Sequence, residues 1–333
     1  MKKLIDKKDK IFISGHKGMV GSALVRKFKE LGYHNLVFAS KEVLDLRDSN
    51  KVKNWFNENK PDITIIAAAK VGGILANDSY PYEFLLDNIK IQNNLIENAW
   101  RVGVKRLLFL GSSCIYPKFS EQPIKEEYLL KGELEPTNEW YALAKICGIK
   151  LCQALRIQYN FDAISLMPTN LYGPGDNYHK TNSHVMASFI RRFCEAKKFN
   201  LDQISCWGTG SPFREFLHVD DLANACLFAL ENWNPSSSDA PLDENKKPLY
   251  WLNVGSGKDI SIKDLASLIS KLVNYKGEIL WDGSRPDGSP KKLLSIDKFR
   301  KMGWEPKIDL ETGISNTIET YNRELESGVL RSE

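Results

Sequence analysis

A tyrosine and a lysine stand four residues apart in segment 140–157, where apolar residues recur with the spacing of a helix. Tyr141 and Lys145 therefore share one helix face. An ammonium group beside a phenol favours the phenolate, so the pair can give and take a proton at a carbonyl or hydroxyl near neutral pH. Tyr141 is the one tyrosine of twelve followed by lysine at this spacing. Taken alone, the pair can also be a solvated helix face.

A glycine-rich run, G-H-K-G-M-V-G at 15–21, lies between the apolar segment 10–14 and the helical pattern 23–28. Strand, glycine loop and helix in this order form a phosphate site, because the free N–H groups of the helix N-terminus face the anion. The run predicts a dinucleotide cofactor. The alternative is a glycine turn that serves only packing between helix and strand.

Hydroxyl groups follow another expected strand. The sequence G-S-S-C-I-Y at 111–116 comes directly after the apolar segment 106–110. Side chains at the carboxyl end of a parallel strand emerge at the edge of the sheet where ligands bind in such folds. We therefore expect the serines to lie near Tyr141.

The elements that position these groups alternate between strand and helix patterns. Strands are expected at 36–39, 62–66, 106–110 and 162–167, with helices between them. This alternation predicts an α/β protein with a Rossmann-type, doubly wound parallel sheet. Beyond about residue 174 the order is less regular, which predicts a smaller C-terminal α/β substrate domain. The expected division assigns 8–175 to a cofactor domain, with segments near 203–225 and 250–258 returning to it, and 176–325 mainly to the substrate domain.

Composition excludes several other classes. Of the 333 residues, 42% are hydrophobic, and the apolar runs are too short to span a bilayer. The net charge of +4 is too small and too dispersed to indicate a nucleic-acid partner. The first ten residues carry lysines but no apolar h-region, so we expect a cytoplasmic protein. The six cysteines include no C-x-x-C pair, and no metal site is expected.

Together these features resemble the extended short-chain dehydrogenases/reductases, which combine G-x-x-G-x-x-G, a serine or threonine at a strand end, and Y-x-x-x-K. Six further segments resemble the GDP-L-fucose synthase family within that group, and the likeness runs from about residue 10 to 320. These segments are A-A-A-K-V-G-G-I at 67–74, L-G-S-S-C-I-Y-P at 110–117, P-T-N-L-Y-G-P at 168–174, N-S-H-V at 182–185, R-E-F-L-H-V-D-D at 214–221 and P-D-G-S-P-K-K-L-L at 286–294.

The resemblance implies a reaction. The family converts GDP-4-keto-6-deoxy-D-mannose to GDP-L-fucose by epimerising C3 and C5 and then reducing the C4 ketone with NADPH. It also implies a homodimer, in which the helix expected at 82–100 and the Tyr141 helix pair across the dimer axis.

The resemblance assigns five catalytic residues. Ser112 and Tyr141 hold the C4 oxygen, Cys114 is the base and His184 is the acid. Tyr141 then protonates the C4 oxygen while Lys145 orients the cofactor ribose. Without the resemblance, Cys114 could equally be a packed thiol and His184 a satisfied polar group of the core.

Cofactor choice depends on the end of the second expected strand, where an acid would hold the ribose of NAD. No acid precedes Glu42, and Ser40 and Lys41 can meet a 2′-phosphate together with Lys17, so we predict NADPH. The alternative is that these lysines are only solvated. Further cofactor contacts, most of them implied by the resemblance, are expected at Gly15, Gly18, Met19, Val20, Gly21, Asp45, Leu46, Ala67, Ala69, Asn88, Leu110, Gly111, Ser113, Lys145, Pro168, Asn170, Leu171 and His184.

The nucleotide-sugar needs guanidinium groups at its diphosphate, and Arg192 and Arg214 are the candidates. Trp207 could pack on sugar or base, and Asp287 could bind ribose hydroxyls. The ordinary alternatives are a surface ion pair for each arginine, a core position for Trp207 and a turn for Asp287.

Two other functions stay open. Another nucleotide-sugar 4-epimerase or reductase of the extended family would share Ser112, Tyr141 and Lys145 but would not need Cys114 and His184. A non-catalytic protein that senses NADP is expected to lack Tyr141 or Lys145, and both are present.

Overall fold

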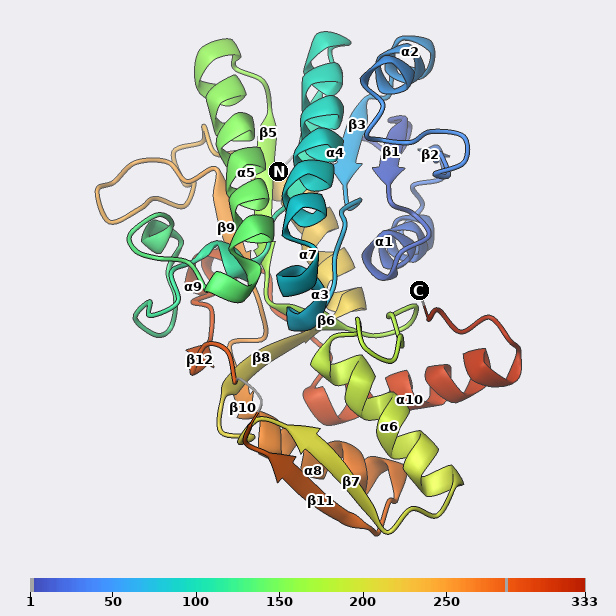
Figure 1. The fold of residues 1–333 in the computed structure, drawn as a ribbon. Coiled ribbons are helices and arrows are strands. Elements are labelled where there is room, and N and C mark those ends of the chain that lie inside the picture. The colour runs from blue at the N-terminus through green and yellow to red at the C-terminus, as the bar shows by residue number, and fades with distance from the viewer. Residues whose placement is uncertain (1–2, 285–286, 333) are drawn as a thin grey trace.

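The computed structural model describes residues 3–284 and 287–332. Its largest element is a six-stranded parallel sheet in the order β2-β1-β3-β4-β5-β9 (Figure 1). The order reverses between β1 and β3, and in such sheets ligands bind in the crevice at the carboxyl ends of those two strands. The strands are β1 Ile11–Ser14, β2 Leu36–Val37, β3 Ile63–Ile66, β4 Arg106–Leu110, β5 Ala163–Pro168 and β9 Trp251–Val254.

Helices cover both faces of this sheet, which explains why its central strands are buried throughout and mostly apolar. Helices α4 and α5 run side by side along one face, and α7 lies behind the sheet with α1 against it (Figure 1). The expected Rossmann-type α/β fold is thus confirmed. The helices around the sheet are α1 Met19–Glu30, α2 Ser49–Asn59, α3 Ile74–Ser79, α4 Pro81–Arg101, α5 Glu139–Tyr159 and α7 Val219–Asn232.

One charged residue interrupts the apolar strands. Arg106 begins β4 and is only 2% exposed. Its guanidinium pairs with Asp162 and donates to the carbonyl oxygens of Ala229 and Trp233. A buried cation needs such partners, and here they join β4 to the start of β5 and the end of α7.

Most elements beyond β5, apart from α7, β9 and α9, form a second group below the large sheet in Figure 1, and many of them surround a second hydrophobic cluster. Strand β8 is central in the smaller sheet, between β10, β12 and β6, while β7 pairs with β11. The expected division into two domains stays a prediction. Helix α9 Asp297–Lys301 packs on β9 with the first core cluster. The elements of the second group are β6 Asn170–Tyr172, α6 Val185–Lys198, β7 Gln203–Trp207, β8 Phe213–His218, β10 Asp259–Ser261, α8 Ile262–Val273, β11 Glu278–Asp282, β12 Lys291–Lys292 and α10 Leu310–Glu326.

The described residues include no candidate for a membrane-spanning helix or for a cluster of metal ligands. None of their helices is long and apolar enough to cross a bilayer. Nor do these residues contain a group of three or more His, Cys, Asp or Glu side chains that could hold a metal ion.

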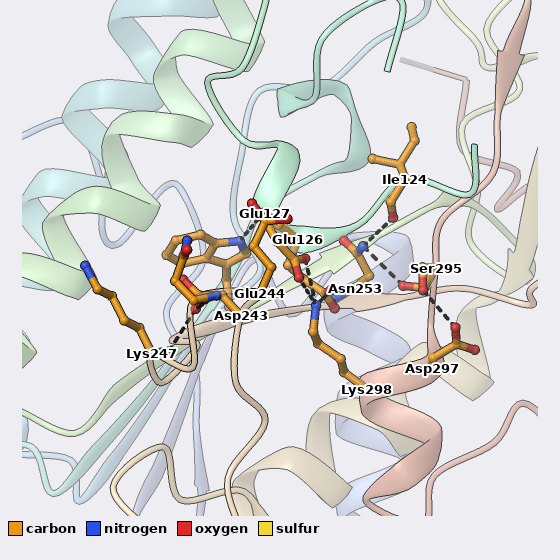
Figure 2. A network of polar contacts seen from close by, with 12 residues as sticks. Ile124, Glu126, Glu127, Asp243, Glu244, Lys247, Asn253, Ser295, Asp297 and Lys298 are labelled. Atoms are coloured by element: carbon orange, nitrogen blue, oxygen red, sulfur yellow. Dashed lines mark hydrogen bonds and ion pairs between the residues drawn. The ribbon is translucent and has the colours of Figure 1, made fainter. Parts of the chain in front are cut away.

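A buried polar network ties the loop after β4 to β9 and α9. The Asn253 side chain accepts from the Tyr116 hydroxyl at 2.6 Å and donates to the carbonyl oxygens of Ile124 and Ser295. Its backbone N–H donates to the carboxylate of Glu126, which has no exposed surface. Figure 2 shows Asn253 between Ile124 and Ser295, and Lys298 pointing at Glu126.

The charge of Glu126 is balanced by Lys298, whose Nζ lies 2.9 Å from one carboxylate oxygen. Lys298 also reaches Glu127 at 2.7 Å. Burial raises the pKa of Glu126, and the Lys298 charge counteracts that rise. Removing either Glu126 or Lys298 would therefore leave the other charge without its partner and destabilise the network.

Replacing Lys298 with Met is expected to lower stability by about 3 kcal/mol, because it leaves the Glu126 carboxylate buried without its cation. The double variant Lys298→Met with Glu126→Gln should recover part of the loss. Thermal unfolding measures both. The control is Lys301→Met, an exposed lysine of the same helix, and a similar loss there would contradict the network's role.

Candidate active site

The glycine loop between β1 and α1 packs directly on the end of β3. Gly15 has a φ of +75°, and a Cβ there would lie 2.9 Å from the backbone of Ala68. A Cβ at Gly21 would overlap the carbonyl oxygen of Gly15. These two glycines are therefore required by the fold itself.

Gly18 is different. Its φ is −77°, which any residue adopts, and a Cβ there would meet no atom closer than 3.4 Å. Gly18 precedes the first turn of α1, which contains no acidic residue and has no side-chain cap. Packing does not require glycine at this position, whereas close approach of a pyrophosphate does. The loop thus fits a dinucleotide better than it fits a simple packing turn.

The serine–cysteine segment forms a single 3-10 turn, Ser113–Ile115, at the carboxyl end of β4. The hydroxyl oxygen of Ser112 caps this turn by accepting from the backbone N–H of Cys114 at 3.3 Å. Ser112 keeps partial exposure, while Ser113 and Cys114 are buried. The structure places Ser112 at the edge of the sheet, as the sequence predicted.

Lys145 projects from α5 toward the same edge. Its Nζ donates to the carbonyl oxygen of Leu110 at 2.8 Å and lies 5.7 Å from the centre of the Tyr141 ring. The strand end, the tyrosine and the lysine are thus brought together.

The sequence predicted that Lys145 would favour the phenolate of Tyr141. For the protein by itself this prediction is wrong. Burial raises the pKa of the Tyr141 phenol, with a smaller contribution from Cys114. Burial also lowers the pKa of Lys145 to about 8. Desolvation outweighs the attraction between ammonium and phenolate, so Tyr141 carries its proton at neutral pH and is ready to donate it.

The pKa values of Cys114 and His184, the expected base and acid, are also shifted so that the neutral forms are favoured. Burial raises the pKa of the Cys114 thiol, and Lys292, the Ser112 hydroxyl and Lys145 counteract only part of that rise. A thiolate at Cys114 is therefore not readily formed in the protein by itself. Burial likewise lowers the pKa of Lys292, which weakens its help to the thiol.

His184 caps α6 without a side-chain hydrogen bond. The residue is exposed, yet protein atoms crowd the ring and the resulting desolvation lowers its pKa. Its segment docks on the α3 loop, since Gly73 donates to the Asn182 carbonyl at 3.0 Å. Asn182 and Phe84 line a cavity of about 230 Å³, and the Phe84 ring meets the Tyr141 ring edge-on at 6.4 Å.

The substrate candidates gather around β8. Arg214 donates to the carbonyl oxygen of Asp287 at 3.4 Å, and burial lowers its pKa against the opposing charges of Glu135 and Asp287. Both carboxylate oxygens of Asp287 accept at 2.8 Å from Thr209, one from its backbone N–H and one from its hydroxyl. Asp287 thus joins two loops, and a contact with ribose stays a prediction. Arg285 and Pro286 of the same motif lie outside the described residues.

The remaining two substrate candidates lie at β7. Trp207 ends this strand and is 55% exposed, so it is not a core residue. Arg192 of α6 donates to the carbonyl oxygen of Ser205 in the same strand. Thr209, which bonds to Asp287, follows Trp207 closely in the chain. Strand β7 therefore connects Trp207 and Arg192 to the region around Arg214 and Asp287.

Glu42, the first acid after the second strand, lies close to the expected 2′-phosphate residues. The Ser40 hydroxyl, followed by Lys17 and Lys41, holds the pKa of Glu42 below its usual value. The turn at 40–42 therefore lies near Lys17 of the glycine loop, and a 2′-phosphate must compete there with the Glu42 carboxylate. Lys17 and Lys41 are exposed and able to do so.

Three other predicted cofactor residues have their side chains engaged within the protein. Asn88 exchanges hydrogen bonds with the backbone of Lys70, at 2.8 and 3.0 Å. Asp45 pairs with Arg47 at 2.7 Å, and that hydrogen bond helps to lower its pKa to about 2. The Asn170 amide donates to the carbonyl oxygen of Glu215 at 2.8 Å. Their cofactor contacts stay predictions, and the structure adds a role in holding the loops at the sheet edge.

The sequence alone did not single out Lys292 and Glu135. Strand β12 pairs with β8 so that Lys292 stands beside Arg214. Glu135 is 6% exposed, pairs with Lys118 at 2.9 Å and contacts the Ser289 hydroxyl at 3.4 Å. No spacing pattern predicts these positions, because they depend on strand pairing between distant segments.

Comparison with known proteins now places this geometry in a family. The family model described as "NAD dependent epimerase/dehydratase family" matches residues 11–239. The chain belongs to this family of enzymes. Putative GDP-L-fucose synthase 2 of Arabidopsis thaliana is 52% identical, over 96% of this chain and 93% of that protein. GDP-L-fucose synthase of Escherichia coli K12 is 47% identical, over 94% of this chain and 97% of that protein.

A solved structure agrees with this membership. MlghC, a GDP-mannoheptose C4 reductase from Campylobacter jejuni with NADP bound, superposes with a TM-score of 0.84 at 33% identity. The match covers 96% of this chain and 99% of that one. The resemblance noted from the sequence is thereby confirmed, and so is the dependence on a nicotinamide cofactor that the family implies.

The glycine loop offers a matched pair of variants. Gly18→Ala is expected to fold within about 1 kcal/mol of the parent, yet to weaken NADPH binding by roughly tenfold or more, because the methyl group stands where the pyrophosphate approaches. Gly21→Ala should instead lower stability, since its methyl group overlaps Gly15. Fluorescence titration of NADPH and thermal unfolding separate the two effects. Undiminished NADPH binding by Gly18→Ala would contradict the phosphate site.

Proposed function

We propose that this chain converts GDP-4-keto-6-deoxy-D-mannose to GDP-L-fucose with NADPH. The observation that carries the proposal is the placement of a thiol, Cys114, in the turn that Ser112 caps, where the Lys145 charge acts on it. A simple C4 reductase needs Ser112, Tyr141 and Lys145 but has no use for the thiol. The names of the curated relatives support the same substrate and product.

Epimerisation precedes reduction in the proposed reaction. Protons at C3 and C5 become acidic because the C4 ketone accepts the negative charge as an enolate. Tyr141 and Ser112 supply the donors for that oxygen, Cys114 removes the protons, and His184 returns protons to the other face. NADPH, when bound, supplies the hydride to C4, and Tyr141 protonates the resulting oxygen.

Cationic groups support the step at Cys114. Lys292 and Lys145 both act on the thiol and favour its ionised form. A negatively charged diphosphate near Arg214 and Lys292 raises the pKa of those cations, so they hold their charge more firmly once substrate is bound. Thiolate formation is thereby coupled to the arrival of the nucleotide-sugar.

The GDP portion is assigned to β7, β8 and the loop at 287. Arg214 and Arg192 neutralise the diphosphate, Trp207 packs on sugar or base, and Asp287 accepts from ribose hydroxyls. The exposure of Trp207 and the burial of Arg214 support this placement, because a desolvated guanidinium binds phosphate strongly.

A C4 reductase without epimerisation is the second candidate. The superposition on MlghC favours it, since that protein is described as a C4 reductase alone. The two functions differ in whether protons at C3 and C5 exchange with solvent.

The homodimer is likewise a proposal. The outer surface of α4 and α5 carries exposed apolar side chains, among them Tyr82, Trp140, Leu143 and Ile157. Pairing of these two helices with a second copy buries that surface. We also propose that the protein acts in the cytoplasm, where the thiol of Cys114 stays reduced.

Replacing Tyr141 with Phe removes the proton donor but no phosphate contact. We expect ketone reduction to fall by a factor of about 100 or more, with NADPH affinity nearly unchanged. Stopped-flow absorbance of the reduced cofactor measures the first quantity and fluorescence titration the second. Tyr159→Phe, on the exposed end of the same helix, is the control. Normal turnover by Tyr141→Phe would overturn the assigned chemistry.

Charge reversal at Lys41 tests the choice of cofactor. Lys41→Glu places like charge against the 2′-phosphate, so the Kd for NADPH should rise by roughly tenfold or more while that for NADH changes by about twofold or less. Lys53→Glu, an exposed lysine of α2, controls for general charge effects. An equal loss for both cofactors would place Lys41 elsewhere.

Cys114→Ser separates the two halves of the reaction. A serine hydroxyl is hardly ionised at neutral pH, so exchange of the C3 and C5 protons should stop while cofactor binding continues. Deuterium uptake in heavy water, followed by NMR or mass spectrometry, measures the exchange. In the parent protein, exchange should still be rising with pH above about 8.5, the usual pKa of a thiol, because burial raises the pKa of Cys114.

The control for this variant is Cys147→Ser, which alters an exposed thiol of α5. Deuterium uptake at both carbons by Cys114→Ser at the parent rate would assign the base to another residue. Absence of uptake in the parent protein would favour the C4 reductase.

A further inference from the structure

The segment that follows α10 returns to the glycine loop. Leu330 packs against the second hydrophobic cluster, and the backbone N–H of Tyr178 donates to the carbonyl oxygen of Arg331 at 2.9 Å. Figure 1 shows the C-terminal end of the chain beside α1. The backbone of Arg331 is therefore held in place by both a hydrophobic and a polar contact.

The side chain of Arg331 points at the phosphate loop. One guanidinium nitrogen, Nη1, lies 3.9 Å from the position of a Cβ at Gly18. Gly18 is the residue whose lack of a side chain is not explained by packing. A cation therefore stands at the point of the loop where the fold leaves room for an anion.

This guanidinium lacks a partner within the protein. Arg331 is half-buried, and no residue of 3–284 or 287–332 forms a hydrogen bond or an ion pair with its side chain. The charge of Asp176 acts on it from beyond ion-pair distance. The Asp176 carboxylate is itself 4% exposed, and its Oδ2 atom has no hydrogen-bond partner. Burial also raises the pKa of Asp176 to about 7, so at neutral pH this carboxyl is only partly ionised and does not neutralise Arg331.

We propose that Arg331 binds the pyrophosphate of the nicotinamide dinucleotide. The planar guanidinium donates to phosphate oxygens from outside the loop, while the N–H groups at the start of α1 donate from inside. The inference rests on the proposed cofactor and adds a binding residue from the far end of the described chain. It commits Arg331 to the pyrophosphate, which NADPH and NADH share, and not to the 2′-phosphate.

The test measures the affinity of Arg331→Gln for both cofactors by fluorescence titration, together with thermal unfolding. Loss of one charge-assisted contact should weaken NADPH and NADH alike by roughly tenfold, with the unfolding temperature unchanged. Arg331→Lys should recover only part of the loss, because an ammonium cannot form the paired contact. Arg323→Gln, an exposed arginine of α10, is the matched control and should bind as the parent does.

Unchanged affinity in Arg331→Gln overturns the inference, and so does a loss confined to NADPH, which would move the contact to the 2′-phosphate. If the parent protein binds both cofactors in these cases, the proposed function stands. If the parent binds neither, the proposed function and this inference fall together.

Discussion

One buried carboxylate holds the two halves of the site in register. Glu215 has no exposed surface, and its oxygens accept from the backbone N–H groups of Gly257 at 2.7 Å and Leu294 at 2.9 Å. Its own carbonyl oxygen accepts from the side chains of Thr169 and Asn170. The ends of β5, β9 and β12 therefore meet on a single residue of β8, and burying its charge is tolerated because the donors surround it.

The consequence for the site follows from strand geometry. Neighbouring residues in a strand point to opposite faces, so the inward direction of Glu215 sends Arg214 outward. The same pairing of β12 with β8 sets Lys292 beside Arg214. Arg214 and Lys292, the cationic groups that we propose for the nucleotide-sugar, are thus fixed relative to the end of β5, whose neighbour β4 leads into Ser112 and Cys114.

Local signals in the sequence predicted the parts of this arrangement that depend on neighbouring residues. The glycine loop, the Tyr141–Lys145 face and the strand before Ser112 each lie within one short segment, and the fold class follows from their alternation. Lys292, Glu135 and Arg331 were missed as site residues because their positions depend on distant pairing. The sequence showed that no acid precedes Glu42, but linear order does not show that the fold brings Glu42 close to Lys17.

The protonation states of the site residues could not be predicted from the sequence, because they depend on how far the fold removes each group from water. Burial pushes Cys114, His184 and Lys145 toward their neutral forms, against the charges that catalysis needs. Phosphate groups raise the pKa of nearby cations, and firmer charges on Lys145 and Lys292 lower the pKa of the thiol in turn. In the proposed reaction no reactive thiolate is therefore required before the anionic ligands arrive, because those ligands would complete the charge balance that ionises Cys114.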